Sequence, residues 1–263
     1  MIEITRSGIK AFCFESLNAE ILDHEVFSRQ GGVSKAPYQS LNLGGTVGDD
    51  PVNVLENHKL IFDFINRPFE SRFDVWQVHG NNIISADRPR KQGEDHIHAD
   101  GIFTDKPGLT LLMRFADCVP ILIFDPKRKV IGIIHAGWQG TLNKIGADAV
   151  NYAHDNFGCE SNDLIVGIGP SICPYCYQIG GNVAQMFVER FGENANKILI
   201  NRSDGIYLDL WLANQITLEE SGVKNIEQSH LCTAQNLGDF YSHRAEKGRT
   251  GRFGVVMGLK VNN

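Results

Sequence analysis

The stretch formed by residues 109–141 constrains the fold of this chain more than any other. Three short apolar runs lie in it, at residues 109–115, 119–124 and 130–134. Such runs, rich in Ile, Leu and Val and bounded by turn residues, are typical of strands. Because they do not alternate with polar residues, they predict strands buried on both faces. Cys118 precedes the second run and His135 follows the third, so we expect both side chains where a rigid sheet passes into loops.

The remaining sequence predicts further strands and helices around this stretch. Expected strands cover residues 11–14, 25–28, 73–78, 164–168 and 253–259, and expected helices cover residues 51–64, about 141–156, 183–191 and 210–221. Asp50-Pro51 is a typical helix start. No Pro/Gly/Ser-rich linker or charge block divides the 263 residues, so we expect one domain, residues 1–263.

Composition excludes several classes of function. A net charge of −6 gives no electrostatic basis for binding nucleic acid. No apolar run reaches the ~18 residues of a membrane span, and the N-terminus lacks the apolar segment of a signal peptide. We therefore expect a cytoplasmic protein whose six cysteines stay reduced. In that setting, a cysteine close to a histidine indicates a metal ligand or a nucleophile.

His79, Cys118 and His135 are the candidate metal ligands. His79 follows an expected strand and precedes Gly80, so all three residues lie at strand ends. Two imidazoles and a thiolate suit Zn²⁺, and three protein ligands leave a fourth position for water or phosphate, as in catalytic sites. Zinc can lower the pKa of bound water to ~7. Asp117 or Gln77 would then orient an imidazole.

Two other interpretations of the same residues stay open. Copper accepts the same ligands, so the sequence does not separate it from zinc. Without a metal, Cys118 would be a nucleophile and His135 its base. Elsewhere, Cys173-x-x-Cys176 lacks the second pair of a zinc knuckle, so we expect an irregular loop there. Arg244, Arg249 and Arg252 form either a solvated face or a phosphate-binding cluster.

Several motifs together make the chain resemble one family, the YfiH-like purine nucleoside phosphorylases, formerly described as multicopper polyphenol oxidases or laccase-domain proteins. The motifs are Arg29-x-Gly31-Gly32-Val33-Ser34, Ser40-Leu41-Asn42-Leu43, Val47-Gly48-Asp49-Asp50-Pro51, Gln77-Val78-His79-Gly80, Ala99-Asp100-Gly101, Ala116-Asp117-Cys118-Val119-Pro120, His135-Ala136-Gly137-Trp138-Gln139-Gly140, Gly169-Pro170-Ser171-Ile172 and Thr250-Gly251-Arg252. The resemblance implies an α/β (α+β) fold of three layers, α/β/α, around a mixed β-sheet. It also implies a zinc site at His79, Cys118 and His135.

The resemblance further implies phosphorolysis of adenosine, inosine, guanosine and methylthioadenosine, together with adenosine deamination. We expect Asp117 to act beside the metal ligands as a catalytic acid. The expected substrate contacts are Arg29, Asn42, Gln77, Gln139 and Arg252, with the arginines neutralising phosphate. The expected partners are purine nucleosides and phosphate, and the expected assembly is a monomer or homodimer. A copper-dependent, laccase-like polyphenol oxidase and a metal-free Cys-His hydrolase remain the alternatives.

Overall fold

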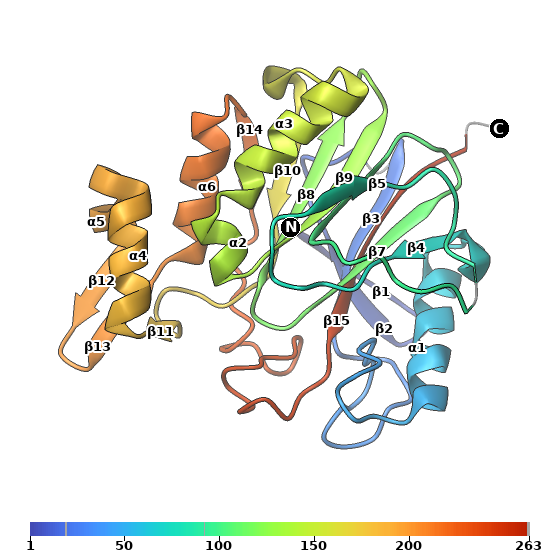
Figure 1. Cartoon of the computed structure of the whole chain (residues 1–263). Helices are drawn as coiled ribbons and strands as arrows, with labels where there is room; N and C mark the ends of the chain where they lie inside the picture. Colours follow the sequence, from blue (N-terminus) through green and yellow to red (C-terminus); the bar gives the residue numbers. More distant parts are fainter. Residues whose placement is uncertain (19, 92, 262–263) are drawn as a thin grey trace.

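Two six-stranded mixed sheets form the centre of the described part of the protein (Figure 1). The computed structural model describes residues 1–18, 20–91 and 93–261. The first sheet has the order β1 (Ile2–Arg6), β2 (Ile9–Cys13), β3 (Leu22–Phe27), β15 (Phe253–Leu259), β7 (Thr110–Phe115) and β4 (Arg72–Asp74). The second has the order β14 (Asn225–Gln228), β10 (Ile165–Ile168), β8 (Val119–Asp125), β9 (Val130–Ala136), β6 (Gly101–Thr104) and β5 (Ile83–Ser85).

Helices cover the outer face of each sheet (Figure 1). Helix α1 (Pro51–Phe64) packs on the first sheet, whereas α2 (Trp138–Leu142), α3 (Ile145–Phe157) and α6 (Leu210–Glu220) pack on the second. At one edge, α4 (Gly181–Phe191) and α5 (Ala195–Ile198) accompany a small sheet of β11 (Gln178–Ile179), β13 (Gly205–Leu208) and β12 (Leu199–Arg202). Three short 3₁₀ turns occupy Phe69–Ser71, Ser161–Asp163 and Gly192–Asn194.

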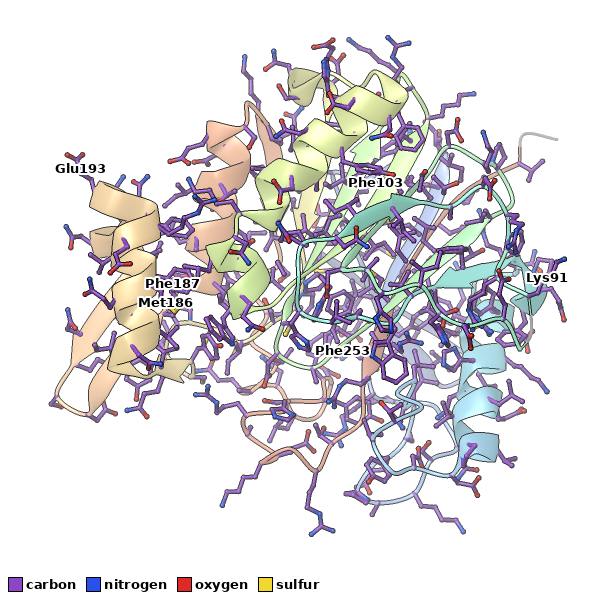
Figure 2. The ribbon with its side chains drawn as sticks, viewed as in Figure 1. Lys91, Phe103, Met186, Phe187, Glu193 and Phe253 are labelled. Carbon is purple, nitrogen blue, oxygen red and sulfur yellow. The ribbon has the colours of Figure 1, made fainter. Side chains whose placement is uncertain are left out.

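One core lies between the two sheets, where side chains of β7 and β15 meet those of β8 and β9. Every residue of β8, β9 and β15 is buried, which explains why their sequences do not alternate. Phe253 lies in this interior, and Phe103 lies toward α3 on the other face of the second sheet (Figure 2). Burying a side chain of this size contributes about 1.5–3 kcal/mol, so these strands form a rigid base for the loops at their ends.

The α+β class and the mixed sheets are confirmed, and several predicted elements match closely. Helix α1 covers the predicted residues because the Asp50 side chain accepts a hydrogen bond from the Val52 amide at 2.9 Å and Pro51 fits the first turn. Instead of one sheet between two helix layers, the strands form two sheets. The chain crosses from the first sheet to the second between β7 and β8, where Asp117 has a φ of 82°.

Two elements differ from the sequence prediction. The strand expected at residues 73–78 ends at Asp74, because the Gln77 side chain replaces the backbone in pairing with Arg114 of β7. The helix expected after Gly137 is split into α2 and α3 at Lys144, whose φ is 62°. One domain over residues 1–263 stays a prediction. Among the described residues, no helix has both the length and the apolar character needed to cross a membrane.

Candidate metal centre

His79, Cys118 and His135 meet where the two sheets separate. Each offers one ligand atom, and the three atoms lie within 4.8 Å of one another. Cys118 ends the crossover from β7 to β8, His135 lies near the end of β9, and His79 occupies the loop after β4 with a φ of 60°. The two imidazole rings are 4.9 Å apart between centroids and nearly perpendicular. Two nitrogens and one sulfur so arranged fit the ligand set of Zn²⁺, with one position left for another ligand.

Asp100 holds His79 and His135 in place through hydrogen bonds. Its carboxylate accepts a hydrogen bond from Nδ1 of His135 at 2.8 Å and is fully buried. It also accepts backbone hydrogen bonds from Val78, His79 and Gly80 at 3.2, 3.0 and 2.8 Å. This pairing occupies Nδ1 of His135 and leaves Nε2 for a metal. We expected Asp117 or Gln77 in this role; the only sequence signal for Asp100 was its place in the Ala99-Asp100-Gly101 motif.

The thiol and the imidazole stabilise each other's charged forms. Burial opposes ionisation of Cys118, but the positive charge of His135 and hydrogen bonds from both histidines lower the pKa of this thiol to about 6. Burial also opposes a charge on His135, but the Cys118 thiolate and Asp100 raise its pKa to about 9. The thiolate form of cysteine is the form that binds metals.

Gly137 gives the three ligands the space to approach. A Cβ atom at this position would lie 3.2 Å from both Sγ of Cys118 and Cδ2 of His79. Gly137 also caps α2 with an extended backbone. A larger residue after β9 would therefore press on Cys118 and His79.

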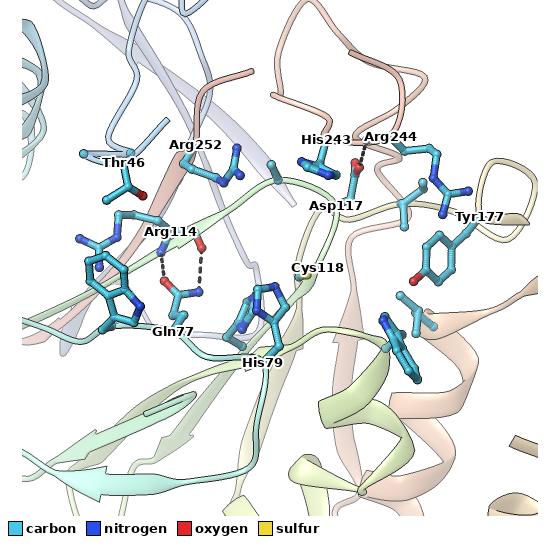
Figure 3. Close-up of a pocket in the computed structure, with 18 of the residues that line it drawn as sticks. Thr46, Gln77, His79, Arg114, Asp117, Cys118, Tyr177, His243, Arg244 and Arg252 are labelled. Atoms are coloured by element: carbon cyan, nitrogen blue, oxygen red, sulfur yellow. Dashed lines mark hydrogen bonds between the residues drawn. The ribbon is translucent and has the colours of Figure 1, made fainter. Parts of the chain in front are cut away.

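The centre opens into a cavity of about 720 Å³ (Figure 3). His79 is exposed to it, and Figure 3 shows Gln77 and Arg114 on one side of His79 and Tyr177 on the other. The lining residues are Gly44, Gly45, Thr46, Trp76, Gln77, His79, His96, Arg114, Ala116, Asp117, Cys118, His135, Trp138, Ile172, Tyr177, Leu210, His243, Arg244 and Arg252. Such a concave site with aromatic walls and a few polar groups is typical of small-molecule binding.

Three of the predicted site residues other than the metal ligands line this cavity: Gln77, Asp117 and Arg252. The Gln77 amide is engaged with the Arg114 backbone at 2.8 and 2.9 Å, so it does not orient an imidazole. Asp117 accepts hydrogen bonds from the Thr233 hydroxyl at 2.6 Å and the Arg244 amide at 2.7 Å. Each of its oxygens thus holds a neighbouring loop, and the catalytic role of Asp117 stays a prediction.

The other three predicted substrate contacts do not line the cavity: Arg29, Asn42 and Gln139. Arg29 forms an ion pair with Glu246 at 3.1 Å and lies over the Tyr241 ring. Asn42 is fully buried, and its side-chain oxygen accepts the Arg252 amide at 2.8 Å. Gln139 is exposed on α2. Arg29 and Asn42 support the loops that carry the cavity residues.

Sequence reasoning missed several residues that line the cavity. Arg114 was hidden within an apolar run, and Trp76 within an expected strand. Arg244 belongs to the arginine cluster of the C-terminal region, but nothing in the sequence indicates that its side chain faces the cavity. Among the residues that the structure describes, neither Arg244 nor Arg252 forms an ion pair with a carboxylate. The described hydrogen bonds of both guanidinium groups go to backbone carbonyl groups.

The fold and this centre define a class of α+β proteins with a His-Cys-His group at the crossover between two sheets. Residues 23–260 match the family described as multi-copper polyphenol oxidoreductase laccase, and the chain belongs to this family. It is 34% identical over 242 residues to "Purine nucleoside phosphorylase YlmD" of Bacillus subtilis, covering 89% of this chain and 87% of that protein. It is 31% identical to "Purine nucleoside phosphorylase YfiH" of Escherichia coli over 236 residues, covering 88% and 91%.

A solved structure has the same fold. The crystal structure of YlmD from Geobacillus stearothermophilus superposes with a TM-score of 0.91 at 31% identity, covering 99% of both chains. The names of the curated relatives support a role as an enzyme of the purine nucleoside phosphorylase kind. The family description and the relatives' names indicate different reactions. The first names a copper-dependent oxidation of polyphenols, and the second names phosphorolysis of purine nucleosides.

Proposed function

We propose that this protein is a zinc-dependent purine nucleoside phosphorylase that acts on adenosine, inosine, guanosine and methylthioadenosine and also deaminates adenosine. The observation that carries the proposal is the convergence of His79, Cys118 and His135 in a cavity of about 720 Å³. The cavity has the size range of small-molecule sites. The names of the relatives support the reaction. We further propose that the protein works in the cytoplasm as a monomer or homodimer.

The three ligands would hold the metal, and Asp100 would keep the His135 ring in place. When bound, zinc supplies a positive charge and a Lewis acid next to the reacting groups. His79 comes from a loop and His135 from a buried strand, so one ligand can adjust while the other is fixed. Gly137 leaves the approach from α2 free of side-chain atoms.

The purine would bind against the apolar wall formed by Trp138, Ile172, Tyr177 and Leu210. Aromatic rings favour offset stacking with a flat base. The phosphate would bind on the opposite side near Arg114 and Arg252. Arg252 reaches the cavity from the loop before β15, and the described hydrogen bonds of its guanidinium group go to the backbone carbonyl groups of Thr250 and Gly251.

In phosphorolysis, a phosphate oxygen attacks C1′ of the ribose and the purine leaves from the same carbon. Guanidinium groups orient the phosphate and balance its charge, which is how arginine usually recognises this anion. In deamination, water replaces the 6-amino group and ammonia leaves. Because Asp117 is fully engaged with its neighbours, we assign it the positioning of the Arg244 loop in both reactions.

An assay of product release from inosine and from adenosine tests this proposal directly. Purified protein incubated with inosine and phosphate is expected to release hypoxanthine and ribose 1-phosphate, while adenosine without phosphate is expected to release inosine and ammonia. His79→Ala, Cys118→Ala and His135→Ala should each lose most of both activities. Wild-type rates in all three variants would refute the role of the centre.

Metal analysis distinguishes the proposal from its alternatives. Protein purified without added metal is expected to contain about one zinc per chain, and chelation should abolish activity that zinc restores. Several coppers per chain with phenol oxidation would favour the chemistry in the family description. Inactivation by thiol alkylation together with full resistance to chelators would favour Cys118 as a nucleophile with His135 as base.

A further inference from the structure

A second group of sulfur atoms lies outside the His-Cys-His centre. Sγ atoms of Cys173, Cys176 and Cys232 lie within 4.8 Å of one another, and all three residues are free cysteines. Cys173 and Cys232 are buried, and Cys176 is half-buried. The sequence alone offered only the Cys173-x-x-Cys176 pair, because the third member lies 56 positions further on than Cys176. The pair lies in an irregular loop, as expected, and this loop places it beside a third cysteine.

The backbone brings these thiols together without a disulfide. The amides of Cys176 and Tyr177 both donate to the Cys173 carbonyl, at 3.0 and 3.1 Å, which closes a turn around the pair. The Cys173 amide donates to Sγ of Cys232 at 3.3 Å. Ser171 also forms a parallel bridge with Cys232, with backbone hydrogen bonds of 3.1 Å on each side. The positions of all three sulfurs are thus set by hydrogen-bonded backbone.

We propose that Cys173, Cys176 and Cys232 form a second metal site that binds a thiophilic d¹⁰ cation, Cu⁺ or Zn²⁺, through three thiolates. Thiolate ligands select these two ions over harder cations. Among the described residues, no histidine, acidic residue or fourth cysteine joins the group. Structural zinc almost always has four ligands, whereas three thiolates satisfy Cu⁺, so we expect the site to prefer Cu⁺. On binding, three S–H protons pass to solvent and three metal–sulfur bonds form, with no change of oxidation state.

The proposed site lies behind one wall of the cavity. Ile172 and Tyr177, on either side of the cysteine pair, line that cavity. Thr233, next to Cys232, donates to Asp117 at 2.6 Å. A cation at the three thiols would therefore tie together the two segments that support this wall and raise the stability of the loaded protein.

The test uses Cys118→Ala protein, in which the first centre is disabled, and offers Cu⁺ and Zn²⁺ in separate anaerobic titrations. We expect about one Cu⁺ per chain to survive gel filtration against a competing chelator, with weaker retention of Zn²⁺. X-ray absorption should show a shell made only of sulfur. Adding Cys176→Ser should abolish retention of both ions, whereas adding Cys159→Ser, a buried cysteine outside both groups, should not.

A labelling measurement needs no variant of the cluster. Cys176 is half-buried, so maleimide should label it in the apo protein, and Cu⁺ should protect it. Failure to retain either ion, retention unchanged by Cys176→Ser, or labelling unaffected by both ions would each overturn the proposal. A disulfide between two of the three cysteines in protein prepared anaerobically would overturn it as well.

Discussion

At the residue scale, we expect Asp100 to determine how tightly the proposed metal centre binds its ion. One carboxylate binds the His135 imidazole and three consecutive amides of the segment that carries His79. Asp100→Asn keeps the shape but replaces one acceptor oxygen with a donor that faces other donors. We expect metal affinity to fall roughly 10–100-fold, the usual cost of losing such a partner. Competition with a chromophoric chelator measures this.

Asp148→Asn is the matched control, because among the described residues the side-chain partner of this carboxylate is the exposed Asn81, at 3.0 Å. It should bind metal as the wild type does. If Asp100→Asn also keeps wild-type affinity while remaining folded, the hydrogen bond to His135 does not tune the centre.

Gly137 sets the space between the ligands at the same scale. The Cβ atom of Gly137→Ala would lie 3.2 Å from Cys118 and from His79, which is too close for either ligand to keep its position. We expect reduced metal content and at least a tenfold loss of phosphorolysis, on the order of 1.4 kcal/mol in transition-state free energy. Metal content per chain and kcat/KM are the measurements.

For Gly137→Ala, the comparison is Gly181→Ala at the start of α4, where a Cβ would meet no atom within 4 Å. That variant should retain metal and activity. Equal behaviour of the two variants would mean that the ligands have more freedom than their contacts with Gly137 indicate.

At the scale of secondary-structure elements, Gln77 connects the end of β4 to β7. Its amide group makes the two hydrogen bonds that a continuing strand would make to Arg114, and it turns the chain toward His79. Gln77→Ala leaves the Arg114 amide and carbonyl without these partners. We expect the free energy of unfolding to fall by about 1–3 kcal/mol, measured by urea denaturation, and the metal affinity to fall because His79 loses support.

The exposed Gln185→Ala on α4 controls for loss of a glutamine side chain, since its only described partner is Glu189 on the same helix face. It should change stability by less than about 0.5 kcal/mol. A Gln77→Ala variant as stable as Gln185→Ala would show that water replaces the lost pairing.

Elements with a strong local signal were predictable from the sequence. Helix α1 has its Asp50 cap, and β8, β9 and β15 are continuous apolar runs. What the sequence did not reveal depends on contacts between distant segments. The sequence does not mark the crossover at Asp117 from the first sheet to the second, because a left-handed backbone leaves no mark in hydrophobic periodicity.

At the scale of the whole molecule, the candidate site was also predictable only where it does not depend on contacts between distant segments. His79, Cys118 and His135 were identifiable because their residue types and strand-end positions suggest metal binding, and the structure brings them together. Asp100, Arg114 and Cys232 were not, because their roles depend on long-range folding rather than on neighbouring residues. Arg29 and Asn42 were expected at the substrate, but they do not line the cavity, and their partners are Glu246 and the Arg252 amide. The charge of a residue and its place in a motif indicate that it matters. They do not show whether its side chain faces the cavity or supports the loops around it.

Glu25 on β3 links the stability of the whole molecule to pH. Burial raises the pKa of its carboxyl group to about 8, nearby Asp23 adds to the rise, and Oε2 has no hydrogen-bond partner among the residues that the structure describes. In the unfolded chain a glutamate has a pKa of about 4.3. Between these values the native state holds one more proton than the unfolded state. Stability is therefore lost as pH rises from about 4.3 to about 8, with a slope of up to about 1.4 kcal/mol per pH unit.

Glu25→Gln removes this proton linkage while preserving the shape of the side chain. We expect its stability advantage over the wild type to grow steadily from about pH 5 to about pH 8, because the neutral amide never has to ionise in a buried place. Urea denaturation across this range measures the difference. Glu56→Gln, an exposed position on α1, should give a curve parallel to that of the wild type. If the Glu25→Gln curve is parallel as well, the carboxyl group is already ionised in the native protein, and β3 must supply it with a partner.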